Sequence, residues 1–192
     1  MHDSRFNRFL AAAARVLAYA ALILAAGVGA QPATGENGYA DESRDWGVAP
    51  TNQLRQQPYH GPTPLEIPGA QVMRTRQLQA MLAGPASPIL IDVLSDPGHL
   101  TLAGAVWLSG AGRGANFLDP VQSVLTHLLR QLTGGDKSRP MVFFCASAEC
   151  WLSYNAALRA VAAGYSRVYW YRGGVEAWVA AGLPTATTSG AR

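Results

Sequence analysis

Charged residues and long apolar runs are scarce in this chain, and each scarcity excludes a class of protein. Charged residues make up 14% of its 192 residues, and the formal net charge is +3. Beyond residue 30, twelve Lys and Arg stand against eleven Asp and Glu, so no basic stripe remains that could bind nucleic acid. The single long apolar run lies at the N-terminus, which excludes a membrane protein with several spans. The length accommodates one ordinary domain and a leader.

The first thirty residues have the three parts of a secretory signal peptide. Residues 1–8 hold two arginines, residues 16–26 are uninterrupted apolar, and residues 27–30 are small. We therefore expect residues 1–30 to be a signal peptide that is cleaved after Ala30, and the mature chain to be secreted from the cytoplasm. An uncleaved membrane anchor is the alternative, although the apolar run is shorter than the roughly 20 residues that a span needs. No cysteine follows the run, which excludes lipid attachment there.

The two cysteines, Cys145 and Cys150, have different meanings in different compartments. In an oxidising space an even pair can form a disulfide, whereas in the cytosol the same pair first indicates metal binding or catalysis. A metal site needs about two further ligands beside two thiolates, and His60, His99 and His127 show no ligand spacing with each other. We therefore predict no metal.

The rest of the chain divides into an arm, a domain and a tail. Residues 31–69 are rich in proline and have no sustained period, which predicts an irregular arm over the domain surface. Trp46, Tyr59 and Ile67 are the residues that could pin this arm to the core. Residues 70–185 form the predicted domain, and residues 186–192 a C-terminal tail.

Apolar strand patterns alternate with helical patterns from residue 70 onward. Strands are expected at residues 71–73, 89–93, 105–108, 141–145 and 167–171. Helices are expected at residues 76–83 after a Thr75 cap, from Pro120 to Gly134 after an Asp119 cap, at 152–163, and at 173–181. This alternation predicts an α/β fold with a parallel sheet between helices, and any site at the carboxyl ends of the strands.

The cysteine loop, residues 145–150, carries the chemical signal. It runs from a buried strand into a helix N-terminus, where unpaired N–H groups and the helix dipole would lower the pKa of a Cys145 thiol and make it a nucleophile. The alternative is a buried cysteine that serves as a small apolar residue. In a regular helix the Cα atoms of Cys145 and Cys150 would lie about 8.7 Å apart, beyond the limit of about 7 Å for a disulfide. A disulfide between them therefore requires a curled loop, and that alternative stays open.

The loop has little positive charge around it. Residues 146–151 contain no Lys or Arg and one acid, Glu149, so their field would repel an anionic ligand. The nearest candidate cation is Arg172, at the end of the last strand. Its alternative interpretation is a solvated surface arginine.

Several stretches, taken in order, resemble the rhodanese-like domain over residues 70–184. They include Leu90-Ile91-Asp92-Val93, His99 with Ala103-Gly104-Ala105-Val106, the strand ending in Cys145, Ala156-Ala157-Leu158 with Gly164-Tyr165, and Gly173-Gly174 with Ala177-Trp178. The resemblance implies a five-stranded parallel sheet flanked by helices on both faces. It also implies that Cys145 takes a sulfane sulfur as a persulfide and passes it to an acceptor. The Gly and Arg usual in such loops are absent, and the loop is about two residues longer, which argues against thiosulfate as the donor.

The resemblance also suggests substrate-pocket residues. They are Ala146, Ser147, Ala148, Glu149, Trp151, Arg172, Asp92 and His99. Trp151 could cover the loop, stack on a flat ligand such as a quinone, or simply pack its helix. Asp92 could accept N–H bonds from the loop or serve as a turn carboxylate.

A narrower resemblance rests on PYHGPTPLEIPGA, GGDKSRP, CASAECWLSYNAA and YRGGVEAW. These segments are similar to secreted rhodanese-like proteins named for a paired-cysteine-tryptophan motif and associated with PQQ-dependent alcohol catabolism. That similarity implies a periplasmic address and an association with PQQ-dependent enzymes. No cofactor bound by this chain itself follows from it.

Two functions compete at this point. The first is a periplasmic sulfurtransferase or thiol–disulfide protein, with Cys145 as nucleophile, Cys150 as resolving thiol, and a small thiol, a sulfane-sulfur donor or a periplasmic redox protein as partner. The second is a non-catalytic binding module in which Cys145 and Cys150 form a structural disulfide. In that case the aromatic surface around Trp151 and Tyr169 to Tyr171 would meet a redox partner or a quinone cofactor.

Overall fold

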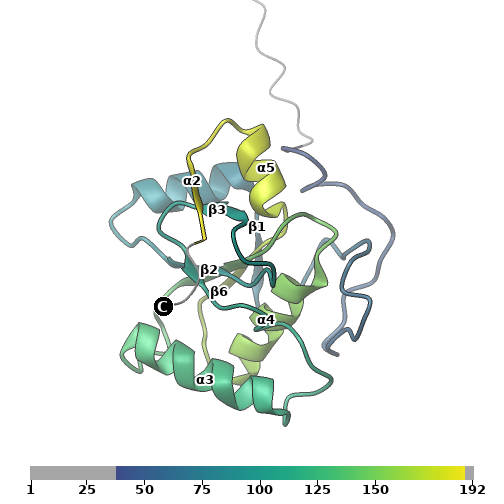
Figure 1. The fold of residues 1–192 in the computed structure, drawn as a ribbon, viewed down its shortest axis with the longest axis vertical. Helices are drawn as coiled ribbons and strands as arrows, with labels where there is room; N and C mark the ends of the chain where they lie inside the picture. Colours follow the sequence, from purple (N-terminus) through teal and green to yellow (C-terminus); the bar gives the residue numbers. More distant parts are fainter. Residues whose placement is uncertain (1–37, 189–192) are drawn as a thin grey trace, which may run out of the picture. The chain divides into compact units, whose positions relative to one another are not determined.

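The computed structural model describes residues 38–188 (Figure 1). The predicted signal peptide and the first seven residues of the arm lie outside the described residues. Within residues 38–188, none of the helices has both the length and the apolar character needed to cross a membrane.

The core of the domain is a five-stranded sheet with the strand order β1-β6-β5-β2-β4. Its strands are β1 (Gln71–Met73), β2 (Ile89–Asp92), β4 (Val106–Trp107), β5 (Met141–Phe144) and β6 (Val168–Tyr171). All four neighbouring pairs are parallel. The carboxyl ends of the strands therefore meet at one edge, and β2 and β5 end there side by side because Asp92 pairs with Phe144.

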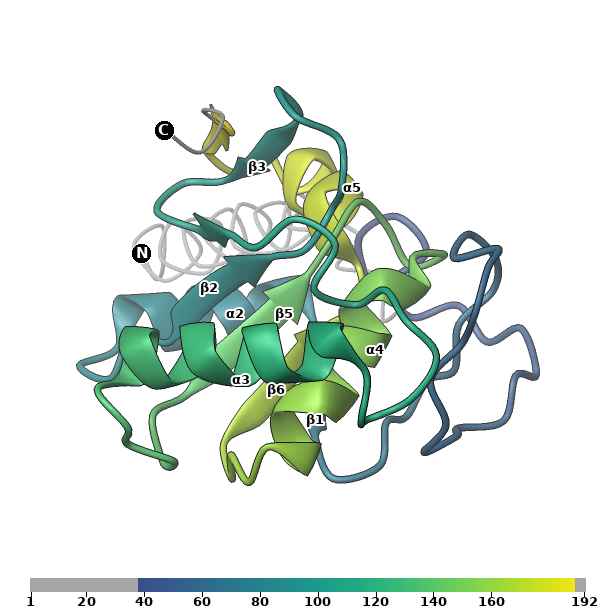
Figure 2. The same cartoon turned by 60° about the horizontal axis from the view of Figure 1, so that its bottom comes forward.

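Four helices cover the two faces of this sheet. Two separate apolar clusters mark the faces: one includes residues of α3 (Pro120–Thr133) and α4 (Trp151–Ala162), the other residues of α2 (Thr75–Ala83) and α5 (Gly174–Ala180). Figure 2 shows α3 and α4 together on one side of the sheet. The predicted five-stranded parallel sheet flanked by helices on both faces is confirmed.

Local chain chemistry explains where α3 begins and ends. The Asp119 carboxylate accepts the N–H of Gln122, and Pro120 occupies the first helical position, where its missing N–H costs nothing. Gly134 ends the helix in the left-handed conformation that glycine adopts without strain. The predicted cap and stop of this helix are confirmed.

Two details of the predicted elements are wrong. Thr75 is the first residue of α2 rather than its cap, and its amide donates to the carboxylate of Glu42 in the arm. Residues 185–187, partly assigned to the tail, form β7 (Thr185–Thr187), which pairs antiparallel with β3 (Leu100–Leu102). Both corrections involve partners distant in sequence, which local patterns do not encode.

The arm is tied firmly to the domain. Leu54 and Ile67 are buried in the core cluster under α3 and α4, and Tyr59 packs against it. The Asn155 side chain bonds to both backbone groups of Arg55, and the Tyr154 hydroxyl bonds to both backbone groups of Thr51. The described part of the arm is therefore a packed layer rather than a loose covering.

Candidate functional site

The cysteine loop curls between the end of β5 and the start of α4. Cys145 directly follows β5, and Cys150 is the N-cap of α4. The two residues are joined as a disulfide, with their Cα atoms 6.4 Å apart. The curl brings these atoms inside the limit of about 7 Å that a regular helix would exceed. Of the alternatives left open by the sequence, the structure therefore contains the intraloop disulfide.

Three amides at the end of the loop are paired with oxygen atoms rather than with the Cys145 sulfur. The amide of Cys150 donates to the Ser147 carbonyl at 3.2 Å, and the amide of Glu149 to the Ser147 hydroxyl at 3.3 Å. The next amide, that of Trp151, donates to the carbonyl of Tyr59 in the arm at 2.9 Å. The prediction of unpaired N–H donors for a thiolate is therefore wrong for these three groups, because each already has an oxygen acceptor.

The loop carbonyls are held by the first turn of α5. Val175 donates its N–H to the Cys145 carbonyl at 3.0 Å, and Glu176 donates to the Ala146 carbonyl at 2.9 Å. Gly174 makes this approach feasible: its φ is +59°, and a Cβ at this position would lie 2.8 Å from the Ala146 carbonyl carbon. The backbone of the cysteine loop is therefore fixed from the side of α5 as well as from α4.

The disulfide is buried. Cys145 is 1% exposed and Cys150 8%, and both belong to the apolar cluster under α3 and α4. We expected the chain to leave the core at the end of β5, but Cys145 remains inside it. The position at a strand end and beside a helix start is as predicted, whereas the exposure is not.

A segment of the arm, residues 59–63, covers the loop, and we call it the strap. His60 forms an antiparallel bridge with Cys150, and the amide of Gly61 donates to the Glu149 carbonyl at 2.8 Å. The Thr63 hydroxyl, itself buried, donates to the carbonyl of Ala148. The sequence offered no sign of this role, because the arm has neither periodic pattern nor chemical motif.

Trp151 lies beneath the strap. It is 3% exposed, its indole N–H donates to the Pro62 carbonyl at 3.1 Å, and the Arg55 guanidinium lies 4.9 Å from its ring centroid. Tyr154 packs against it at 5.0 Å. The ring thus packs α4 against the arm, and the hypothesis that it stacks on a flat ligand is wrong for this structure.

The predicted aromatic interaction surface is also wrong. Trp170 and Tyr171 are fully buried in β6. Of these three aromatic residues, only Tyr169 is half-buried. Burial raises the pKa of Tyr171, which a hydrogen bond with Thr75 partly offsets, so its hydroxyl stays neutral. These rings are part of the core rather than a docking face.

Arg172 is an anchor for the arm. It is 1% exposed, which excludes a solvated surface arginine. All five of its N–H donors are occupied, by the carbonyls of Asp41, Glu42, Arg44 and Thr63 and by the Thr63 hydroxyl. Burial lowers the pKa of Arg172 to about 10, while Asp41 and Asp45 raise it, so the guanidinium is charged at neutral pH. It has no donor left for a substrate anion.

Asp92 and His99 form a separate polar cluster at the end of β2. The fully buried Asp92 carboxylate accepts from the amide of Leu94 at 2.9 Å and from the Thr101 hydroxyl at 2.6 Å, and His99 Nε2 lies 2.7 Å away. The other ring nitrogen of His99 contacts the Asp96 carbonyl. Of the two roles open for Asp92, its contacts are those of a turn carboxylate, and none of its hydrogen bonds reaches the cysteine loop.

Ser153 is the site residue that the sequence interpretation missed. Its hydroxyl oxygen is buried and lies 3.5 Å from Cys145 Sγ. Among the predicted pocket residues of the loop itself, Ala148 is buried, and three are half-buried: Ala146, Ser147 and Glu149. A signal existed, because Ser153 falls in the first turn of the helix that Cys150 caps. That turn faces the end of β5 in any strand–loop–helix unit of this kind.

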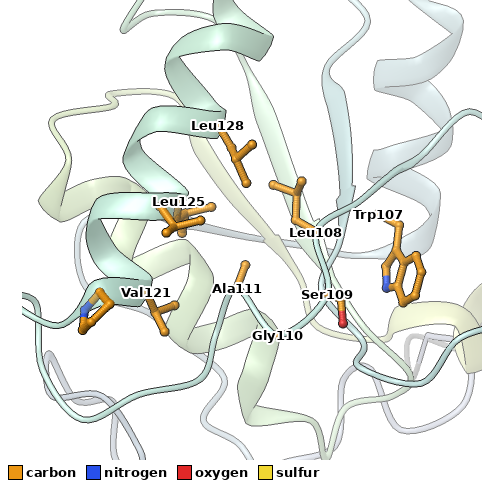
Figure 3. A pocket seen from close by; sticks show the side chains of 10 residues that line it. Trp107, Leu108, Ser109, Gly110, Ala111, Val121, Leu125 and Leu128 are labelled. Atoms are coloured by element: carbon orange, nitrogen blue, oxygen red, sulfur yellow. The ribbon is translucent and has the colours of Figure 1, made fainter. Parts of the chain in front are cut away.

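An apolar pocket of about 630 Å³ lies elsewhere, between α3 and the segment that follows β4 (Figure 3). Val121, Leu125 and Leu128 of α3 face Leu108 and Ala111 across it. No residue of the cysteine loop lines this pocket. Within the part of the chain that the structure describes, no three His, Cys, Asp or Glu side chains gather as metal ligands.

Comparisons with known proteins identify one family. The sequence profile of the Rhodanese-like domain matches residues 74–181. No curated protein matches the sequence. Among solved structures, a thiosulfate sulfurtransferase from Pseudomonas aeruginosa is 18% identical, with a TM-score of 0.48 over 62% of this chain and 21% of that chain. The polysulfide-sulfur transferase homodimer from Wolinella succinogenes is also 18% identical, with a TM-score of 0.44 over 62% of this chain and 79% of that chain. This chain thus spans about a fifth of the Pseudomonas protein.

Proposed function

Because this chain belongs to the rhodanese-like domain family, we propose that Cys145 is the nucleophile of a sulfur-transfer or thiol–disulfide reaction and that Cys150 is its resolving partner. The observation that carries this proposal is the Cys145–Cys150 disulfide at the carboxyl end of β5. In open α/β sheets, sites gather at this edge. A second cysteine within bonding distance supplies the group that a resolving step requires.

The proposed cycle starts from the dithiol. The Cys145 thiolate attacks the outer sulfur of a sulfane-sulfur donor. This sulfur is transferred to Cys145, which becomes a persulfide, and the rest of the donor leaves as a thiolate. The Cys150 thiolate then attacks the inner sulfur of this persulfide, hydrosulfide leaves, and the Cys145–Cys150 disulfide forms. A dithiol reductant restores both thiols by two exchange steps and is itself oxidised to a disulfide. With a disulfide donor instead, Cys145 forms a mixed disulfide and the same resolving step releases a thiol.

The charges around the loop favour a donor other than thiosulfate. Residues 146–151 contain no cation, Glu149 is an acid, and the donors of Arg172 are all occupied by the arm. Neither the loop nor Arg172 would therefore offer a compensating charge to a small dianion. We propose that the donor is a small organic persulfide or disulfide, or a cysteine persulfide or disulfide of a redox protein, and that a thiol compound serves only as the reductant.

The mass of the exported protein tests the proposal most directly. With and without reductant, it distinguishes the dithiol, the disulfide lighter by two hydrogen atoms, and a persulfide heavier by one sulfur atom. Incubation of the reduced protein with an organic persulfide should add one sulfur to the Cys150→Ser variant and none to Cys145→Ser. Alkylation of Cys145 at about pH 6 no faster than that of an ordinary thiol would contradict its role as nucleophile.

Burial of the disulfide supports a second candidate function, in which the bond is a structural clip of a binding module. Cys145 and Cys150 are 1% and 8% exposed, and the strap lies over them. Under this alternative, a reductant would leave the disulfide intact under native conditions. The Cys145→Ser, Cys150→Ser variant would then keep partner binding while losing stability.

We further propose that the protein acts in the periplasm and is linked to PQQ-dependent alcohol catabolism. The predicted signal peptide and the disulfide support the location, since such bonds persist in oxidising compartments. The similarity of four segments to the paired-cysteine-tryptophan proteins supports the link. N-terminal sequencing that begins at Met1 would contradict export. Unchanged growth of a deletion strain on alcohols would contradict the link.

A further inference from the structure

Ser153 places a hydroxyl next to the sulfur that the proposed chemistry needs. The residue lies in the first turn of α4 and is 1% exposed. Its Oγ is 3.5 Å from Cys145 Sγ, a distance at which an O–H group can donate to sulfur. Because the hydroxyl is inaccessible to water, its hydrogen must go to one of the protein atoms around it.

The hydrogen bonds of Ser153 fix the direction of this hydroxyl. A serine hydroxyl has one hydrogen to donate and two lone pairs to accept. The indole N–H of the fully buried Trp170 donates to the Ser153 oxygen at 3.0 Å. Indole is only a donor, so the hydroxyl hydrogen cannot point toward Trp170. In the disulfide form it goes to the Cys150 carbonyl at 3.2 Å.

Three backbone donors near the sulfur are engaged elsewhere. The amides of Glu149, Cys150 and Trp151 donate to oxygen atoms of the loop and the strap. A thiolate buried without a donor would be costly, because burial disfavours the charged form. A side-chain hydroxyl that can turn its hydrogen toward the sulfur lowers this cost, and Ser153 is such a neighbour.

We propose that Ser153, oriented by Trp170, is a positioning residue that donates its hydroxyl hydrogen to the Cys145 thiolate whenever the disulfide is open. This inference rests on the proposed function. Two electrons from a dithiol reductant break the S–S bond, and both cysteines become thiols. When Cys145 then loses its proton to solvent, the Ser153 hydrogen turns from the Cys150 carbonyl to the negative sulfur.

Alkylation of Cys145 as a function of pH measures this hydrogen bond. The full chain carrying Cys150→Ser provides a reference with Cys145 as its single thiol. Ser153→Ala in this background should raise the pH midpoint of alkylation by about one unit, since a hydrogen bond to a charged group is lost. Ser153→Thr retains a hydroxyl and should restore the midpoint of the reference. A purely structural role would change stability and leave the midpoint where it was.

The outcomes separate this inference from the proposed function. If the reference protein reacts at about pH 6 no faster than an ordinary thiol, the proposed function fails. If it reacts fast and Ser153→Ala has the same midpoint, the inference is overturned while the proposed function stands. Should Ser153→Ala fail to fold, Trp170→Phe decides, because it keeps the hydroxyl and removes its orienting donor. A raised midpoint in Trp170→Phe supports the inference, and an unchanged one overturns it.

Discussion

Replacement of Arg172 by leucine should detach the strap and expose the disulfide. Arg172 makes five hydrogen bonds to the arm, at 2.9 to 3.0 Å, and lies 4.6 Å from the ring centroid of Trp46. One of these bonds goes to the Thr63 hydroxyl, which in turn donates to the carbonyl of Ala148 in the cysteine loop. Arg172 therefore connects the arm and the strap to the covered disulfide.

The expected magnitude follows from these contacts. Hydrogen bonds to a charged group contribute about 1.5 to 3 kcal/mol each, but the freed carbonyls regain water when the arm lifts, so we expect Arg172→Leu to lose about 4 kcal/mol of unfolding free energy. If about 3 kcal/mol of this loss falls on local opening of the strap, the rate of disulfide reduction should rise about a hundredfold. Urea unfolding measures the first quantity, and thiol release under native conditions with excess dithiothreitol measures the second.

A matched control separates strap release from the loss of any arginine. Arg167 directly precedes β6, as Arg172 directly follows it, and the Arg167 side chain is exposed. Arg167→Leu should therefore change neither the stability nor the rate of disulfide reduction appreciably. Arg172→Lys keeps the charge but has fewer donors, and should be intermediate. If Arg172→Leu is reduced as slowly as the wild-type protein and is equally stable, Arg172 does not hold the strap in place.

Three further predictions concern stability. Burial raises the pKa of Asp119, but hydrogen bonds from Arg159 and Gln122 outweigh burial and lower the pKa to about 2. The ionised Asp119 should therefore contribute about 2 kcal/mol to the free energy of unfolding above about pH 5, and this contribution should be lost as the pH falls toward 2. Urea unfolding across this range should show the loss in the wild-type protein and not in Asp119→Asn. Replacement of both cysteines by serine should cost about 2 kcal/mol, because the loop then gains freedom in the unfolded chain; equal urea midpoints would contradict this. In thermal unfolding, Gly174→Ala should lower the stability by about 3 kcal/mol and Gly182→Ala by about 1 kcal/mol. Both glycines have a positive φ, but only at Gly174 would a Cβ meet other atoms. Equal losses in the two variants would contradict the role of crowding.

The secondary structure of the domain was predictable because its signals are local. Residues 141–145 and 89–93 are short apolar runs between turn residues, and they become β5 and β2. Asp119, Pro120 and Gly134 delimit α3 by their own backbone and capping chemistry. β3 and β7 were missed as a pair, since each has three residues and gains its hydrogen bonds only from the other.

The candidate site was only partly predictable. The order of strand, loop and helix placed Cys145 at the carboxyl edge of the sheet, and the spacing to Cys150 left a disulfide open. The environment of the sulfur was mispredicted in part, because three amides that look free in a strand-to-helix turn are paired with Ser147 and Tyr59. Arg172 was interpreted either as a cation for the cysteine loop or as a solvated surface arginine, and it is neither. Its hydrogen-bond acceptors lie in the arm, more than a hundred residues earlier in the chain, where no local pattern indicates them.

The sequence by itself determined the sheet, its helices and the position of one cysteine at the sheet edge, since each follows from apolar periodicity and turn chemistry within a few neighbouring residues. Only the tertiary structure decided what surrounds that cysteine. Thr63, Ser153 and Trp170 meet around the loop because the arm folds back and because α4 packs on β6. Such contacts depend on how buried surfaces fit together in three dimensions, and no local pattern in the chain records that fit.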